Sequence, residues 1–128
     1  MKNLLIVDDE ENYRFSIQFA LKKHYQIFLA RNMEEALEIL KRNDVRIGIA
    51  LIDIRLAAED DANIDGIKVL EWIQMNQQTI DVFMMSSYKV FDYGVKALNL
   101  GARHFFEKPI DIISLKTILQ EKSASHGI

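Results

Sequence analysis

The stretch IGIALID, residues 47–53, decides the fold that this sequence can adopt. Its first six residues are apolar or glycine, without the polar alternation of a half-exposed strand. Such a run is typical of a strand that is buried on both faces of a parallel sheet. Asp53 follows the run directly, so the predicted strand ends at a carboxylate.

Similar short runs occur on both sides of this stretch, and helix-period segments separate them. The predicted strands are residues 3–7, 26–30, 47–52, 81–85 and 104–107. The predicted helices are residues 11–23, 33–42, 66–76, 89–100 and 112–122. Alternation of this kind predicts an α/β fold with five βα units and a parallel sheet.

Two polar residues mark helix starts. Asn32 precedes the second predicted helix and Glu35 lies three residues on, which is the spacing of a capping box. Asp111 is placed to cap the last helix. These signals support the predicted helices independently of their apolar periodicity.

Composition and length narrow the class of protein. The 128 residues are 49% hydrophobic and 27% charged, which fits one globular domain, expected at residues 1–122 with a tail at 123–128. The net charge of -3 and the scattered basic residues disfavour direct nucleic-acid binding. The absence of cysteine excludes disulfides and thiol chemistry. The opening apolar run is too short for a signal peptide or a membrane span, so we expect a cytoplasmic protein.

Five chemically active residues each fall at the end of a predicted strand: Asp8, Asp9, Asp53, Ser86 and Lys108. The carboxyl ends of parallel strands meet at one edge of the sheet, where ligands bind. Three carboxylates in one pocket would repel each other strongly, and a divalent cation relieves that repulsion. Oxygen ligands favour Mg²⁺, whereas zinc would require His or Cys.

This arrangement points to phosphoryl chemistry. A carboxylate such as Asp53 can attack phosphorus and carry the phosphoryl group as an aspartyl phosphate. The Lys108 ammonium can pair with a phosphoryl oxygen, and the Ser86 hydroxyl can donate a hydrogen bond to another. An acidic pair or a lone Asp after a strand is by itself more often a turn or cap residue, and Lys-Pro is a common dipeptide.

Four segments resemble the response-regulator receiver domains of two-component signalling: VDDEE, LIDIRL, MMSSY and GARHFFEKP. The resemblance implies a flavodoxin-like fold with strand order 2-1-3-4-5. It implies that a histidine kinase or a small phosphodonor phosphorylates Asp53, so the chain is a phosphoryl acceptor rather than an enzyme. It also implies Mg²⁺ held by Asp9, Asp53 and the backbone carbonyl of Arg55, with Asp8 acting mainly through water.

The resemblance further implies how a signal leaves the site. Ser86 would move toward the phosphoryl group, and Phe105 would swing inward in step. The fourth helix, the last strand and the last helix would then meet a second copy or an output domain. The Lys108-Pro109 peptide bond is expected to be cis.

The sequence departs from the receiver pattern after Asp53. The following loop is long and contains Glu59, Asp60, Asp61 and Asp65, which either face water or attract cations and repel phosphodonors. Arg55 and Tyr88 stand at positions that in the family line the path of water to the phosphoryl group. Because both side chains are large, we predict a long-lived phosphoform.

Two alternatives remain open. A haloacid-dehalogenase-type phosphatase also uses Asp, Mg²⁺, Ser or Thr, and Lys, but Arg55 stands where its general acid would be. A pseudo-receiver would be an interaction module that never takes phosphate. The sequence does not identify the kinase, the output domain, or whether the chain is part of a longer regulator.

Overall fold

The computed structural model describes residues 1–57, 59–77, 79–87 and 91–123. Along these residues five strands alternate with five helices. The strands are β1 (Lys2–Val7), β2 (Tyr25–Ala30), β3 (Ile49–Asp53), β4 (Asp81–Ser86) and β5 (His104–Glu107). The helices are α1 (Glu11–Leu21), α2 (Met33–Leu40), α3 (Asp65–Asn76), α4 (Phe91–Asn99) and α5 (Ile112–Ser123).

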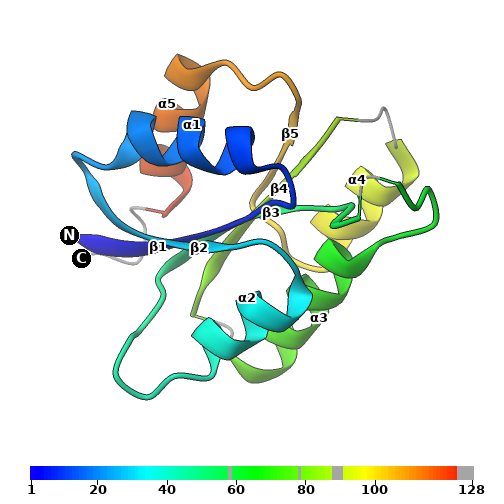
Figure 1. Ribbon diagram of the computed structural model, residues 1–128, viewed down its shortest axis with the longest axis horizontal. Coiled ribbons are helices and arrows are strands. Elements are labelled where there is room, and N and C mark those ends of the chain that lie inside the picture. The colour runs from blue at the N-terminus through cyan, green and yellow to red at the C-terminus, as the bar shows by residue number, and fades with distance from the viewer. Residues whose placement is uncertain (58, 78, 88–90, 124–128) are drawn as a thin grey trace.

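The five strands form one parallel sheet in the order β2-β1-β3-β4-β5 (Figure 1). This confirms the predicted flavodoxin-like α/β fold. β1 lies between β2 and β3 and pairs with both of them. The strand order therefore reverses at β1, and the crevice outside its carboxyl end is where such sheets bind ligands.

Helices cover both faces of the sheet, α1 and α5 on one face and α2, α3 and α4 on the other (Figure 1). The strands supply alternate residues to the two cores, so Leu4 and Ile6 face one layer while Leu5 and Val7 face the other. All four are fully buried, and each contributes about 1.5–3 kcal/mol from burial. The rigid centre of the sheet thus leads directly to Asp8.

Element boundaries differ from the predicted ones by two residues or fewer, where the structure describes them. α5 was predicted to end at residue 122 and instead includes Ser123, whose buried hydroxyl donates to the carbonyl of Leu119. The predicted start of the fourth helix, at residue 89, lies outside the described residues. Asn32 caps α2 as predicted, since its side chain accepts the Glu35 N–H. The Glu35 carboxylate accepts the N–H of Arg31, one residue before the cap, and it also pairs with the Arg31 guanidinium.

Gly66 fixes the start of α3 against the end of β3. Its N–H donates to the carbonyl of Ile54, and a Cβ at this position would lie 1.9 Å from the backbone oxygen of Asp53. Only glycine permits this approach. The loop after Asp53 is therefore held down at its far end. Among the described helices, none is long and apolar enough to cross a membrane.

Candidate functional site

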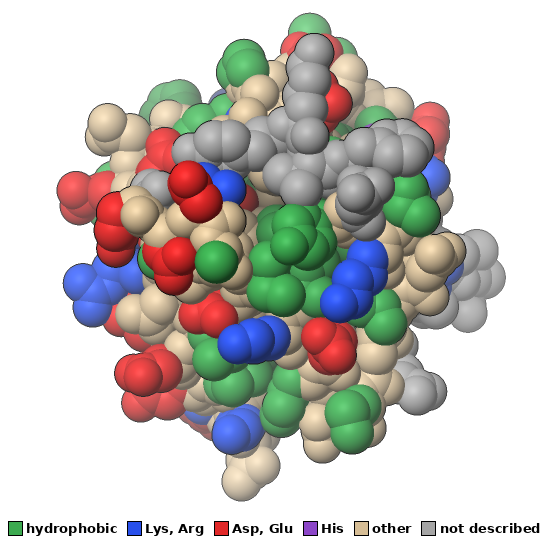
Figure 2. Space-filling view, turned by 90° about the vertical axis from the view of Figure 1, so that its right-hand side faces the viewer, with side chains coloured by type: hydrophobic (Ala, Val, Ile, Leu, Met, Phe, Trp, Pro, Cys, Tyr) green, Lys and Arg blue, Asp and Glu red, His purple; other side chains and the backbone are tan. Residues whose placement is uncertain are grey.

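Four carboxylates meet at the carboxyl ends of β1 and β3. Asp8, Asp9, Glu10 and Asp53 each offer an oxygen, and these oxygens lie within 4.8 Å of one another. The register of the sheet explains this meeting, because Val7 pairs with Ile52 and so Asp8 emerges beside Asp53. Figure 2 shows the right-hand side of Figure 1, where these strands end and where acidic side chains gather toward the left of the view.

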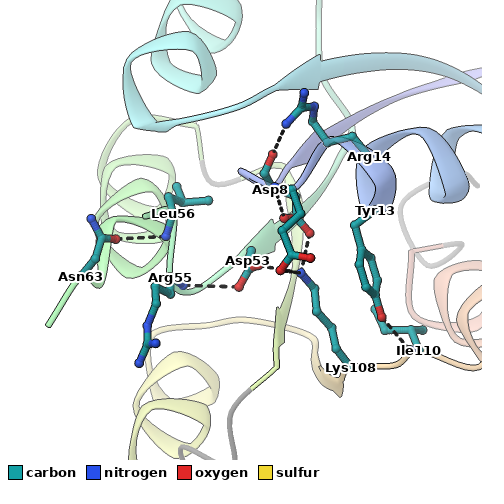
Figure 3. Close-up of polar contacts among 10 residues, drawn as sticks. Asp8, Tyr13, Arg14, Asp53, Arg55, Leu56, Asn63, Lys108 and Ile110 are labelled. Carbon is teal, nitrogen blue, oxygen red and sulfur yellow. Dashed lines mark hydrogen bonds and ion pairs between the residues drawn. The ribbon is translucent and has the colours of Figure 1, made fainter. Parts of the chain in front are cut away.

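Lys108 lies at the centre of this group, although it follows the distant strand β5 (Figure 3). Its Nζ is 2.6 Å from Asp8 Oδ2 and 2.7 Å from Asp53 Oδ2. Glu10 is more distant from the ammonium, at 3.8 Å. The lysine side chain is only 3% exposed, so these contacts are largely shielded from solvent.

Burial controls the protonation of Asp53. It raises the pKa of the carboxyl group to about 7, and the neighbouring charge of Asp8 acts in the same direction. The Lys108 ammonium and the N–H of Arg55 oppose this shift. Burial lowers the pKa of Lys108, but the charges and hydrogen bonds of Asp53 and Asp8 outweigh it, so that pKa lies above its usual value. Two buried carboxyl groups therefore share one ammonium, which does not fully offset the cost of burying the negative charge of Asp53.

Asp8 is held from several sides. It is fully buried, its Oδ1 accepts the N–H of Glu10 and its Oδ2 accepts from Lys108. The guanidinium of Arg14, itself buried in α1, donates to the backbone carbonyl of Asp8 at 2.8 Å. Asp9 is partly exposed at the same edge. Asp8 is therefore a fixed anchor of the site, and Asp9 is the more accessible of the pair.

The loop after Asp53 is tied to the site through Arg55 (Figure 3). The Arg55 N–H donates to Asp53 Oδ1 at 3.3 Å. Its guanidinium reaches the other way, 3.1 Å from Asp61 Oδ1 and 3.2 Å from the Asp61 carbonyl. Asn63 closes the loop, because its side-chain oxygen accepts the N–H groups of Leu56 and Asp65, each at 3.0 Å.

Ser86 ends β4 beside this loop. It is buried, and its backbone carbonyl accepts the N–H of Lys108 at 2.8 Å. A hollow of about 10 Å³ next to it is lined by Arg55 and Asp61 from the loop and by Tyr93 from α4. The predicted access residue Tyr88 lies outside the described residues.

Phe105 and Pro109 lie on either side of Lys108 in the chain. Phe105 belongs to β5, and Pro109 directly follows the lysine. Phe105 is half-buried and packs against the core under α4, where a Cβ on Gly94 would be 3.5 Å from its ring. The Lys108-Pro109 peptide bond is cis, the geometry that the resemblance implied. The structure thus brings Asp8, Asp9, Asp53, Ser86 and Lys108 to one edge of the sheet.

Several contact residues were not among the predicted site residues: Glu10, Tyr13, Arg14 and Asn63. Glu10 directly follows Asp8 and Asp9, so its position next to them in the sequence could have predicted that it belongs to the cluster. Tyr13 and Arg14 reach the site from the first turns of α1, and helix phase alone does not show which side chain turns back toward the strand end. The bridging role of Asn63 depends on the path of its loop.

The sequence profile described as the response regulator receiver domain matches residues 4–120. The regulatory protein AtoC of Escherichia coli is 33% identical over 94% of this chain, which spans 25% of that protein. Sporulation initiation phosphotransferase F of Bacillus subtilis is 29% identical over 94% of this chain and 92% of its own length.

A solved response regulator receiver domain protein from Methanospirillum hungatei superposes with a TM-score of 0.86 at 26% identity. The comparison covers 98% of this chain and 95% of that one. The profile match extends over most of the chain and includes every residue of the cluster. The chain therefore belongs to the response regulator receiver domain family.

Proposed function

We propose that Asp53 accepts a phosphoryl group from the phosphohistidine of a sensor histidine kinase or from a small phosphodonor. An Asp53 oxygen forms a bond to phosphorus while the bond from phosphorus to the donor atom breaks. With phosphohistidine the electron pair stays on the imidazole nitrogen, which takes up a proton. With acetyl phosphate the bond to the acyl oxygen breaks, and acetate leaves with the electron pair. The observation that carries the proposal is the buried contact of Asp53 with Lys108, 2.7 Å away and beside Asp8.

The charge of the site supports a divalent cation as cofactor. Four carboxylates lie close together, and among the residues that the structure describes a single ammonium, that of Lys108, is buried between them. Oxygen ligands of this kind suit Mg²⁺. Asp9, Asp53 and the backbone carbonyl of Arg55 would hold it, and Asp8, whose oxygens already accept two hydrogen bonds, would act through water. When bound, Mg²⁺ supplies positive charge that neutralises crowded carboxylates and phosphoryl oxygens.

Lys108 and Ser86 assist at defined positions. Lys108 already reaches Asp53, so a small shift of its ammonium would bring it to an oxygen of the phosphoryl group. Ser86 ends the neighbouring strand β4, and its hydroxyl is proposed to donate to a second phosphoryl oxygen. Both contacts strengthen as negative charge develops during transfer.

Arg55 and Tyr88 are proposed to slow hydrolysis of the phosphoform. The Arg55 guanidinium is mostly buried, with 14% of its side chain exposed, and it lines the hollow beside Ser86. From there it can screen the phosphoryl group from attacking water. Asp61 holds this guanidinium, so the acidic loop regulates the screen.

The switch is proposed to run from Ser86 to Phe105. Receiver domains of response regulators pair with histidine kinases, and the signal here would leave through α4, β5 and α5 toward a second copy or an output domain. The packing of Phe105 under Gly94 supports this route, because it links β5 to α4. We propose that the receiver domain extends one residue beyond the expected end at 122, because α5 includes Ser123.

The test is phosphorylation by acetyl phosphate with Mg²⁺, read by intact mass. We expect the wild type to gain one phosphoryl group that hydroxylamine removes, and Asp53→Asn to gain none. Asp44→Asn is the matched control, because Asp44 is an exposed carboxylate paired with Arg42. An unmodified wild type would favour the pseudo-receiver alternative, and steady turnover of phosphate esters would favour a phosphatase.

A further inference from the structure

Tyr13 contacts both Lys108 and the backbone just after it, although it lies on α1 and far from the lysine in sequence (Figure 3). The lysine Nζ is 4.1 Å from the centre of the tyrosine ring. The tyrosine hydroxyl accepts the N–H of Ile110, at 3.3 Å, two residues after the lysine. One side chain thus touches the ammonium and also the backbone segment that carries it.

The Tyr13 ring lies on a side of the Lys108 ammonium that the carboxylates of Asp8 and Asp53 do not occupy. Two of its three N–H groups donate to Asp8 and Asp53. An aromatic face attracts a cation through its quadrupole but takes no proton from it, so it stabilises the charge without drawing Lys108 away from Asp53. Because the lysine is almost fully buried, this attraction is weakly screened by solvent.

We propose that Tyr13 is a positioning residue for phosphoryl transfer. Its ring holds the Lys108 ammonium toward Asp53, and its hydroxyl fixes the segment after Pro109. The role rests on the proposed function, since Lys108 is the group through which Tyr13 acts. Without the ring, the lysine would spend less time in the orientation that meets the phosphoryl group.

The surroundings of Tyr13 allow it to be replaced. Its other neighbours form an open groove of about 380 Å³ between α1 and the segment before α5, lined by Asn12, Ser16, Ile17, Ile110 and Ile112. A smaller or altered ring here opens onto the groove and leaves no sealed cavity. Variants at position 13 therefore report on the contact with Lys108 more than on core packing.

The first test is the rate of phosphorylation by acetyl phosphate. We expect Tyr13→Phe to stay within about twofold of wild type and Tyr13→Leu to be roughly five- to thirtyfold slower, the range that corresponds to a partly desolvated cation–π contact. Replacing Tyr13 by phenylalanines with increasing fluorination keeps the shape and weakens the quadrupole, so the rate should fall step by step. Equal rates along that series would overturn the proposal.

Phe19→Leu is the matched control. Phe19 lies on the same helix and has Lys22 4.6 Å from its ring centre, but it is 72% exposed. We expect its rate to equal that of the wild type. A loss as large as that of Tyr13→Leu would mean that any change of α1 slows the reaction, which contradicts a specific role for Tyr13.

A second measurement needs no phosphodonor. In a double-mutant cycle by urea unfolding, Tyr13→Leu should lower the folding equilibrium constant several-fold more when Lys108 is present than in the Lys108→Met background. Equal effects in the two backgrounds would show that Tyr13 does not hold Lys108. If the wild type takes no phosphoryl group, the proposed function fails, and this cycle still decides the contact.

Discussion

Lys108 contacts Asp8 and Asp53 inside the protein, whereas Arg42 contacts Asp44 on its surface, and the distances are similar. The pKa values of Asp53 and Asp44 are nevertheless shifted in opposite directions. Hydrogen bonds from Arg42 lower the pKa of Asp44, while burial raises the pKa of Asp53 to about 7 in spite of Lys108. The comparison shows that the distance between two charged groups does not by itself determine how their pKa values shift. The number of neighbouring charges and the exposure to water determine the pKa shifts and the stabilisation that the pair provides.

The largest expected effect comes from removing the buried cation. Lys108→Met leaves two buried carboxylates without their partner and should lower the free energy of unfolding by about 3–5 kcal/mol in chelator-treated protein. Urea unfolding measures the change. Arg42→Met, the surface counterpart, should leave the midpoint unchanged. Equal effects would erase the contrast between the two pairs.

The pH dependence of stability should have opposite signs at the two sites. Because the pKa of Asp53 is raised from 3.8 to about 7, the folded state keeps a proton that the unfolded state has lost. The stability from Asp53 is complete below pH 4 and is lost as the pH rises to 7. The difference between wild type and Asp53→Asn, measured with chelator, should therefore fall by a few kcal/mol over this window.

The contribution of Asp44 to stability should depend on pH in the opposite direction. Its pKa is lowered, so its contribution is present above the ordinary value of 3.8 and is lost as the pH falls below it. Wild type should therefore be more stable than Asp44→Asn at neutral pH, and this difference should shrink only in the acid range. A parallel pH profile for the two variants would contradict the assignment of Asp53.

Added Mg²⁺ should sharpen the contrast further. At a concentration one hundred times its Kd, a ligand that binds only the folded state stabilises it by about 2.7 kcal/mol. We expect this increase in wild type and in Asp44→Asn, and little of it in Asp53→Asn. Thermal unfolding with a chelator as reference gives the measurement. Equal stabilisation of all three proteins would place the cation elsewhere.

The smallest expected effect concerns Arg55 and Asp61, a pair intermediate between the two kinds. Asp61 is 95% exposed, so Asp61→Asn should cost less than about 1 kcal/mol of stability. Freed from Asp61, the guanidinium can turn toward the phosphoryl group, and the phosphoform should last roughly two to five times longer, as a contact of that size allows. Arg55→Ala should shorten its lifetime. Decay of the phosphoform after donor removal, followed by intact mass, distinguishes these outcomes.

The sequence by itself determined the sheet and the edge at which the site lies. Apolar runs buried on both faces specify parallel strands, and parallel strands place their carboxyl ends together, so Asp53 and Lys108 had to approach each other. Where the structure describes them, helix and strand bounds followed to within two residues, because apolar periodicity and caps such as Asn32 are local properties.

Only the tertiary structure decided how the side chains meet. Lys108 lies 100 residues from Asp8 and 55 from Asp53, and its reach across β4 depends on the twist and register of four strands. The contact of Tyr13 with Lys108 and the turn of Arg55 toward Asp61 depend on side-chain directions, which no periodicity encodes. Burial of the cluster is likewise a property of the whole fold, because water is excluded by elements that are distant in sequence.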